Sequence, residues 1–286
     1  MKTIFDLLRA KQWTKNLLIY AALVFTKNLF NGPFLIKSTI GFVLWCLIAS
    51  SIYIVNDVRD CKEDSYHPVK KKRPIASGKI SKDTAIAISV MLLLVSLLGS
   101  FLIDRPFFLV ILIYAILNTL YSIVLKHIVI IDVFIVAANY VIRAVSGAVI
   151  INVTISPWFL ICTSLLALFL ILAKRRYELS LRESSKHRKI LNEYSIPLLD
   201  EMISVVTSST VIAYSLYTFT SQTAQSHNLL MLTIPFVLYG IFRYLYLIHK
   251  KNMGGSPELV LLKDIPLIID IVLYVITTLI IMYLKK

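Results

Sequence analysis

The run 56–64, which reads NDVRDCKED, follows one long apolar segment and contains Asn56, Asp57, Asp60 and Asp64. Asp57, Asp60 and Asp64 are spaced three and four residues apart, so a helix continuing past Val55 would place their carboxylates on one face. Like charges placed this way repel, and a divalent cation would relieve the repulsion. Carboxylate oxygens in small number suit Mg²⁺, which completes its shell with water and phosphate oxygens. The spacing therefore predicts a magnesium site formed by Asp57, Asp60 and Asp64, with Asn56 adding a neutral oxygen. The alternative is a solvated helix end whose acids pair with nearby lysines.

Four cations, Lys70, Lys71, Lys72 and Arg73, follow these acids directly and precede a turn bounded by Pro74. Acids that hold a metal, next to bases that hold phosphate, are a recurring arrangement for a diphosphate ligand. We therefore expect Lys70, Lys72 and Arg73 to contact phosphate groups.

A second basic segment covers residues 174–200. Between residues 174 and 194 it contains seven Lys and Arg against three Glu, and its first Asp is Asp200. This balance predicts a surface that binds phosphate rather than a second cluster that binds metal. Its candidate ligands are Lys174, Arg175, Glu178, Arg182 and Arg188.

The elements that must position these residues are strongly apolar. Hydrophobic residues make up 58% of the 286 and charged residues 16%, which excludes a disordered chain and an ordinary soluble domain. A bilayer core about 30 Å thick needs a helix of about 20 mostly apolar residues. Such segments predict an all-α, polytopic membrane bundle of about nine helices within one domain, 1–286. Eight is the alternative count, because the first segment contains Lys27 and could lie in the interface. The expected spans are 17–36, 38–55, 84–103, 106–125, 128–151, 156–173, two within 202–242 that are separated by a polar turn at 221–228, and 265–284.

The net charge of +14 is distributed unevenly along this topology. With nine helices, 23 of the 30 Lys and Arg fall on the side of the N-terminus and five on the other side. Lys and Arg accumulate in cytoplasmic loops, so the N-terminus and the loops 56–82 and 174–200 are predicted to be cytoplasmic. Contact with anionic lipid is the simpler explanation for such loops, but it does not account for the acids among the bases.

Some ionisable residues fall within predicted spans, where charge is costly and usually faces a cavity or a partner. Asp132 and Arg143 are eleven residues apart, about 16 Å along one helix, so direct pairing is not expected. We expect Asp132 to line a polar cavity near the cytoplasmic end and Arg143 to bridge helices at greater depth. Arg243 is expected to extend its charge toward the membrane surface.

The run 56–64 matches the signature N-D-x-x-D-x-x-x-D, and on this motif and the segments 67–68 and 73–78 the whole chain resembles the UbiA-type intramembrane prenyltransferases. The resemblance implies nine helices, a cavity that faces the cytoplasm, and Mg²⁺ as cofactor. Typical members carry a second Asp-rich motif after the sixth helix, where this chain has the basic segment 174–200. That departure argues against an ordinary prenyl-diphosphate transferase.

Within that superfamily the chain is similar to the polyprenyl-phosphate phosphoribosyltransferase branch. The run 9–16 is close to its R-x-x-Q-W-x-K-N segment, and residues 174–178 match its K-R-x-x-E segment. Residues 143–147 match a pattern with Arg and Gly in the fifth helix, and 255–264 resemble its last cytoplasmic loop. Lys71 stands where that branch is expected to have Arg, which keeps the charge but loses a bidentate donor.

This resemblance implies transfer of 5-phosphoribose from phosphoribosyl diphosphate (PRPP) to a polyprenyl phosphate, with release of pyrophosphate, at the cell membrane. Lys15, beside Trp13, is the candidate for the lipid phosphate, and an interfacial anchor is its alternative role. Glu178 would orient a cation or contact ribose hydroxyls, with structural pairing as the alternative. The segment from Tyr121 to Lys126, leading into Asp132, completes the candidate substrate-binding residues.

Two other functions remain open on the sequence. The first is a conventional prenyltransferase that uses an isoprenyl diphosphate and an aromatic or other acceptor. The second is a lipid-binding or transport protein without catalysis, although the ionisable residues gather in loops rather than along a path through the spans. Nucleic acid is not expected as a partner, and assembly into a homo-oligomer is left open.

Overall fold

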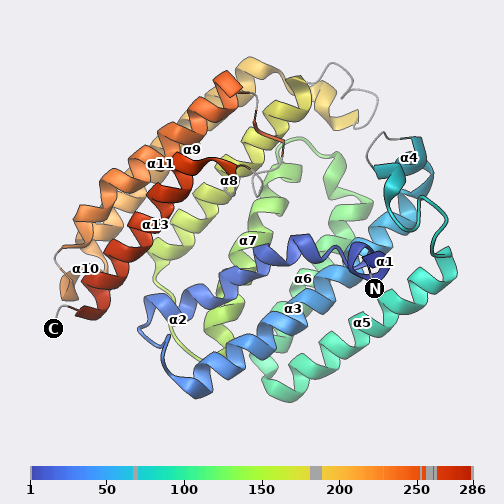
Figure 1. Ribbon diagram of the computed structural model, residues 1–286, viewed down its shortest axis with the longest axis horizontal. Helices are drawn as coiled ribbons and strands as arrows, with labels where there is room; N and C mark the ends of the chain where they lie inside the picture. The colour runs from blue at the N-terminus through green and yellow to red at the C-terminus, as the bar shows by residue number, and fades with distance from the viewer. Residues whose placement is uncertain are drawn as a thin grey trace. The chain divides into compact units, whose positions relative to one another are not determined.

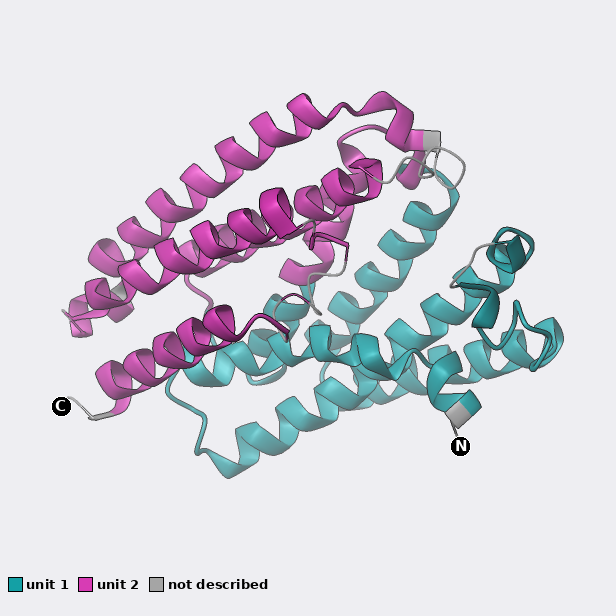
Figure 2. Ribbon diagram, turned by 45° about the horizontal axis from the view of Figure 1, so that its top comes forward, with its two compact units in different colours: residues 1–125, 142–154 teal, residues 126–141, 155–286 magenta. Residues whose placement is uncertain are grey.

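The computed structural model consists of helices and connecting segments, with no strand in the ranges given at the end of this paragraph. Its contacts divide the chain into two compact units, shown in Figure 2. Unit 1 comprises residues 1–125 and 142–154, and unit 2 comprises residues 126–141 and 155–286. That residues 1–286 form one domain stays a prediction. The structure describes residues 2–66, 70–180, 189–227, 229–251, 253–255, 260 and 263–284.

Eight helices in the described residues are long and apolar enough to cross a membrane. They confirm the predicted spans from the second onward, and the short helix α10 (Gln222–Ser226) confirms the polar turn between two of them. The chain is therefore a multi-pass membrane protein. The spanning helices are α3 (Gly32–Arg59), α5 (Lys82–Ile103), α6 (Arg105–Ile123), α7 (Ile131–Ile150), α8 (Pro157–Ser180), α9 (Ile196–Thr220), α11 (Ile234–Lys251), which η6 (Leu230–Thr233) precedes, and α13 (Ile265–Leu279), which η7 (Ile280–Leu284) continues.

The prediction of one α-helix over 17–36 is wrong. The helical segment begins earlier, as the 3₁₀ helix η1 (Ala10–Tyr20), continues as α2 (Ala21–Phe25), and ends before α3 begins at Gly32. A 3₁₀ helix rises about 2.0 Å per residue, so η1 and α2 together extend roughly 30 Å, the thickness of a bilayer core.

The segment formed by η1 and α2 packs antiparallel to α3, as Figure 1 shows. Near its start, Trp13 Nε1 donates to Ser50 Oγ at 3.0 Å, and at the end of η1 the Tyr20 hydroxyl donates to Thr39 Oγ1 at 3.2 Å. The segment therefore has the length and the course of a ninth crossing, although eight helices meet the criterion of length and composition in the described residues.

Four spanning helices begin with the same local signature, a capping side chain two residues before a proline. Each capping oxygen accepts a backbone N–H at the start of the helix, and proline suits the first turn because it needs no donor there. These caps place the starts of α3, α6, α9 and α13. The caps are Asn31, Asp104, Ser195 and Asp264.

Within unit 1, small polar residues join α3 to α5. Ser51 Oγ donates to Ser89 O at 2.9 Å, and Ser89 Oγ donates to Ser51 O at 3.0 Å. Small side chains let transmembrane helices approach closely while they satisfy each other's hydrogen bonds. Large apolar residues such as Leu98 and Leu102 on α5 remain exposed, as expected of surfaces that face lipid.

Unit 2 has its own apolar core, formed where α8 and α9 pack together and α11 packs on α9. Phe169, Leu199, Tyr244 and Leu247 lie in this core, together with Val133 from the first turn of α7. The core holds the start of α7 and the C-terminal half of α8 in place. The remaining short elements are α1 (Lys2–Leu7), α4 (Cys61–Tyr66), η2 (Lys70–Lys72), η3 (Leu125–His127) and η5 (Lys189–Glu193).

Candidate functional site

The acidic cluster of unit 1 lies where α3 gives way to α4. The helix continues past Val55, as predicted, but it ends at Arg59, and Asp60 follows it as the C-cap residue. Asp57 therefore belongs to α3 and Asp64 to α4, and their carboxylates are brought together by tertiary contacts rather than by one helix face. Both side chains are almost completely buried.

Arg73 joins these two buried carboxylates. Its Nη1 atom donates to Asp57 Oδ1 at 2.9 Å and to Asp64 Oδ2 at 2.5 Å. Lys70 Nζ lies 3.7 Å from Asp64 Oδ1. The basic run that the sequence assigned to phosphate thus folds back onto the acids that precede it.

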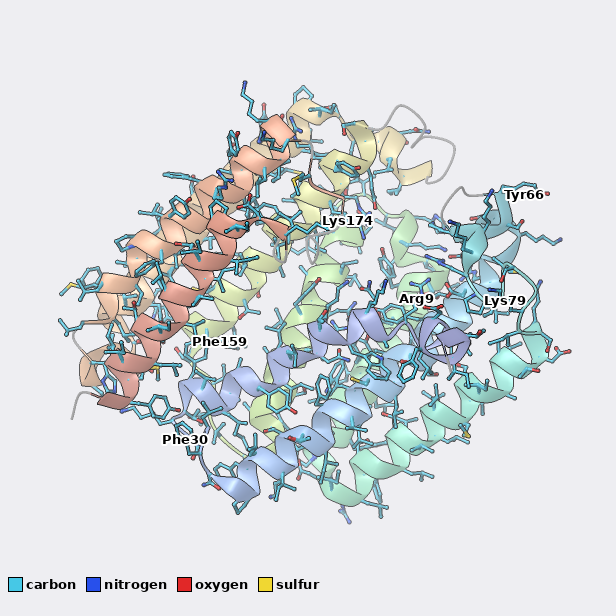
Figure 3. The ribbon with its side chains drawn as sticks, in the orientation of Figure 1. Arg9, Phe30, Tyr66, Lys79, Phe159 and Lys174 are labelled. Carbon is cyan, nitrogen blue, oxygen red and sulfur yellow. The ribbon has the colours of Figure 1, made fainter. Side chains whose placement is uncertain are left out.

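Arg9 is a member of this cluster that the sequence interpretation did not include among the site residues. It stands between α1 and η1, beside the end of α3, where Figure 3 labels it. Arg9 Nε donates to Asp57 Oδ2 at 3.1 Å, its Nη2 donates to Asp57 Oδ1, and its guanidinium lies over the Tyr53 ring. Its φ of 52° lies in the left-handed region, an uncommon conformation for a residue with a side chain. Its place in the run 9–16 was the available sequence signal.

The other predicted members lie around this pair. Asn56 Oδ1 accepts a hydrogen bond from Ser122 Oγ at 2.7 Å, which ties α3 to α6. Asp60 is partly exposed at the helix break, and Lys72 is exposed. Within the residues that the structure describes, no group of three His, Cys, Asp or Glu side chains is close enough to hold a metal ion. The assignment of all three aspartates to one ion stays a prediction.

The donor set nevertheless suits a divalent cation. Asp57 and Asp64 present oxygens to one common nitrogen, Arg73 Nη1, so a positive charge already stands between the two carboxylates. Mg²⁺ favours carboxylate oxygens of this kind. An ion in this place would have to displace the Arg73 guanidinium.

The second cluster, in unit 2, forms where α8 continues past the predicted span. The helix extends to Ser180 and so carries residues 174–178 in its last turns. Arg175 is buried; its Nε donates to Asp132 Oδ2 at 3.0 Å and its Nη1 to Glu178 Oε2 at 2.7 Å. Glu178 thus pairs with one of the candidate phosphate-binding cations, and whether it orients that cation for a ligand stays a prediction.

Tyr194 completes this second cluster. Its hydroxyl donates to Asp132 Oδ1 at 2.7 Å and accepts the Ile130 N–H at 2.7 Å. Burial and the hydrogen bond to Asp132 raise the pKa of Tyr194 to about 12, so the phenol stays protonated at neutral pH. Asp132 is completely buried, and Arg175 and Tyr194 occupy both of its oxygens.

The remaining candidates have different environments. Lys15 is partly buried within η1, and the Trp13 side chain beside it donates a hydrogen bond to Ser50 of α3. Both roles expected for Lys15, contact with lipid phosphate and an interfacial anchor, stay predictions. Tyr121 lies in the last turn of α6, Lys126 in η3 and Lys174 in α8, and all three are partly buried. Arg182 and Arg188 lie outside the described residues, as do residues 67–69 and 256–259.

Arg243 pairs with the residue that caps α13. Its Nε and Nη2 donate to the two oxygens of Asp264 at 3.0 and 2.9 Å. The expectation that this charge extends toward the membrane surface stays a prediction.

The eight apolar helices define the class of the protein, which is a multi-pass membrane protein. Unit 1 carries an acidic helix end with adjacent bases, and unit 2 carries a basic helix end. The family model described as "UbiA prenyltransferase family" matches residues 17–261. The chain belongs to this family, which confirms the resemblance inferred from the motifs.

Curated relatives and solved structures agree with this assignment. Decaprenyl-phosphate phosphoribosyltransferase of Mycobacterium tuberculosis is 32% identical over 90% of this chain and 86% of its own length. The protein of the same name from Corynebacterium glutamicum is 34% identical over 90% and 80% of the two chains. A UbiA homolog from Archaeoglobus fulgidus, bound to DMAPP and Mg²⁺, superimposes with a TM-score of 0.75 over 98% of this chain and 99% of its own. At 18% identity this last likeness concerns the fold alone.

Proposed function

We propose that this protein is a transferase that moves 5-phosphoribose from PRPP to a polyprenyl phosphate, forming polyprenyl-phosphoryl-5-phosphoribose and pyrophosphate. The observation that carries the proposal is the identity of 32–34% to relatives named decaprenyl-phosphate phosphoribosyltransferase, over 90% of the chain. The basic helix end of α8, in place of an Asp-rich motif, agrees with it. A sugar diphosphate and a lipid phosphate both need cations.

We assign the diphosphate of PRPP to the cluster of unit 1. Asp57 and Asp64, together with Asp60 and Asn56, would hold Mg²⁺, which when bound neutralises negative charge on a diphosphate. Arg9 and Arg73 now pair with the carboxylates. Once an ion takes their place, these guanidinium groups can bind phosphate oxygens bidentately.

The remaining cations would hold the other phosphate groups. Lys70 and Lys72 are assigned to the sugar side, and Lys15 to the lipid phosphate. On unit 2, Arg175 pairs with two carboxylates, those of Asp132 and Glu178. We therefore assign Arg175 and Asp132 first to holding the end of α8 in place, and only second to binding phosphate. The remaining assigned substrate-binding residues are Tyr121, Lys126, Lys174, Glu178, Arg182 and Arg188.

The reaction itself asks little of a base. A phosphate monoester is already an anion at neutral pH, so its oxygen can attack C1 of the ribose without prior loss of a proton. The new C1–O bond forms as the C1–O bond to the diphosphate breaks, and the electron pair of that bond leaves with pyrophosphate. The work of the protein is to bring two polyanions together and to stabilise the leaving group.

We also infer that the site faces the cytoplasm. The charge asymmetry of 23 cations to five supports this orientation. PRPP is a soluble, charged substrate, and a cytoplasmic site gives access to it. The same asymmetry supports the inner or plasma membrane as the location.

The test is direct. The purified protein would receive PRPP labelled in the ribose, polyprenyl phosphate and Mg²⁺, and labelled lipid would be extracted into organic solvent. We expect labelled lipid with the wild-type protein and none with Asp57→Asn. If no labelled lipid forms while an isoprenyl diphosphate is consumed with an aromatic acceptor, the protein is a conventional prenyltransferase and the assignment is wrong.

A further inference from the structure

The helix η1 is unusual in its length and its geometry. It contains eleven residues, whereas 3₁₀ runs longer than three or four are uncommon because their hydrogen bonds are poorly aligned. Its burial follows a period of three, as three residues per turn require. Asn16 and Ile19 are buried, while Lys11, Thr14 and Leu17 on another face are exposed. An element so disfavoured locally needs tertiary contacts to keep it in this form.

The buried side chain of Arg143, from the part of α7 in unit 1, supplies one such contact. Arg143 Nε donates to Asn16 Oδ1 at 2.8 Å, and Asn16 Nδ2 in turn donates to Cys46 Sγ of α3 at 3.3 Å. The guanidinium is held in place by the Tyr114 hydroxyl at 3.0 Å from Nη2, and it lies over the rings of Tyr114 and Trp45. The middle of η1 is thus bound between α7 and α3.

Gly147, one turn further along α7, supplies the second contact. A Cβ atom built at this position would lie 2.1 Å from the carbonyl oxygen of Ile19. The atom it would meet is backbone, so the helix itself would have to move. The close approach of η1 to α7 therefore requires glycine here.

We propose that Arg143 and Gly147 are positioning residues that hold η1 in its 3₁₀ form, and so place Lys15 and Arg9 for the lipid phosphate and the diphosphate. Lys15 is next to Asn16, and Arg9 immediately precedes η1. The role of Lys15 and Arg9 rests on the proposed function. The contacts that hold η1 do not depend on it.

The geometry gives the size of the effect. If η1 relaxed to an α-helix, its eleven residues would shorten by roughly 5 Å, because the rise falls from about 2.0 to 1.5 Å per residue. The turn per residue would fall by about 20°, which over the six residues from Arg9 to Lys15 amounts to roughly 120°. Both cations would then leave their present places relative to Asp57.

The experiment uses Cys46 as a reporter of η1. Cys46 is buried beneath Asn16, so its reaction with N-ethylmaleimide should be slow unless η1 moves. Labelling at Cys46 would be followed by peptide mass spectrometry in the full-length protein, with Cys61 and Cys162 as internal references. Gly147→Ala is the test variant. Gly99→Ala is the matched control, because its Cβ would meet only the flexible end of the Leu44 side chain at 2.8 Å.

We expect Gly147→Ala to raise the rate of Cys46 labelling at least about tenfold, the effect of losing one hydrogen bond to a charged group. We also expect it to raise the KM for polyprenyl phosphate by a similar factor, with Gly99→Ala unchanged in both measurements. Asn16→Ala, which removes the contact with Arg143 and introduces no clash, should also raise the KM for polyprenyl phosphate. Its Cys46 is not used as a reporter, because Asn16 itself covers that thiol. Arg143→Lys should raise the KM for polyprenyl phosphate less than Arg143→Met does, because a lysine charge without the two-pronged guanidinium keeps only part of the contact.

Two results would overturn the proposal. One is a Cys46 that stays protected in Gly147→Ala. The other is a Cys46 that becomes reactive while the KM for polyprenyl phosphate stays at the wild-type value. If the wild-type protein transfers no phosphoribose at all, the proposed function fails, whereas the labelling comparison still decides whether Arg143 and Gly147 hold η1.

Discussion

The hydroxyl of Tyr194 can be removed with almost no change in side-chain shape, and its loss tests the network that holds Arg175. The hydroxyl donates to Asp132 Oδ1 and accepts the Ile130 N–H, both at 2.7 Å. Ile130 has a φ of 69°, in the left-handed region that a β-branched residue adopts only under constraint. Tyr194 therefore stabilises both the buried carboxylate and the strained turn that begins α7.

The magnitude follows from these two bonds. A hydrogen bond to a charged group contributes about 1.5–3 kcal/mol, and an N–H left without its partner costs on the order of 1 kcal/mol more. We expect Tyr194→Phe to lower the free energy of unfolding by about 2–4 kcal/mol, and the midpoint of thermal unfolding by on the order of 10 °C. Tyr20→Phe is the matched control, because it loses only an exposed bond of 3.2 Å to Thr39 and should cost less than about 0.5 kcal/mol.

Thermal unfolding in detergent, followed by circular dichroism, would measure both variants. The measurement would be repeated in an Asp132→Asn background, where the cost of Tyr194→Phe should fall by about 1 kcal/mol, since the charged acceptor is gone. At alkaline pH the folded state holds the Tyr194 proton more tightly than the unfolded state, because its pKa is raised to about 12. Between pH 10 and 12 the wild type should therefore lose stability relative to Tyr194→Phe, by up to about 1.4 kcal/mol per pH unit. Equal stability of Tyr194→Phe and Tyr20→Phe at neutral pH would refute the network.

Three further outcomes are expected. Hydrogen bonds from Arg243 lower the pKa of Asp264. This pair should therefore contribute stability above pH 4, and that stability should be lost as the pH falls through the lowered pKa of Asp264. Asp264→Asn should abolish this acid-dependent loss, as measured by thermal unfolding. Chelation of divalent ions should stop phosphoribosyl transfer and added Mg²⁺ should restore it, whereas Asp57→Asn should stay inactive at every Mg²⁺ concentration assayed. Arg73→Met should raise the KM for PRPP by about 10–100-fold, the loss of one charge-assisted bond, and an unchanged KM would contradict its assignment to phosphate.

The acidic site was predictable in its composition but not in its construction. The spacing of Asp57, Asp60 and Asp64 on an extended helix indicated one face, and the helix does extend to Arg59. The break at Asp60 could not be foreseen, because it accompanies a contact with Arg73, a residue brought back by the turn that follows. The spacing of residues along one helix does not predict which side chains from another segment will contact that helix.

The first crossing shows a different limit. The search for an apolar α-helix placed it at 17–36, because Lys11 and Lys15 interrupt the earlier residues. In a 3₁₀ helix those residues need only one buried face in three, and Asn16 and Ile19 lie on that face, with Trp13 partly buried. A local pattern could not reveal that Arg143 and Gly147, more than a hundred residues away, would stabilise it.

Counting charges also overstated how many cations in residues 174–200 are available to phosphate. Arg175 is bonded to Asp132 and Glu178, and Arg176 Nε donates to Asp200 Oδ1 at 2.5 Å. Freeing a guanidinium from a buried carboxylate costs several kcal/mol, so Arg175, which is held by the buried Asp132, shapes the end of α8 before it serves a ligand. Two aspartates outside the run 174–194 change the balance of charge there. Asp132 was assigned to a span, and Asp200 lies at the end of the segment 174–200. Arg175→Met should therefore lower the free energy of unfolding as well as substrate binding, because it removes the guanidinium that pairs with the buried Asp132.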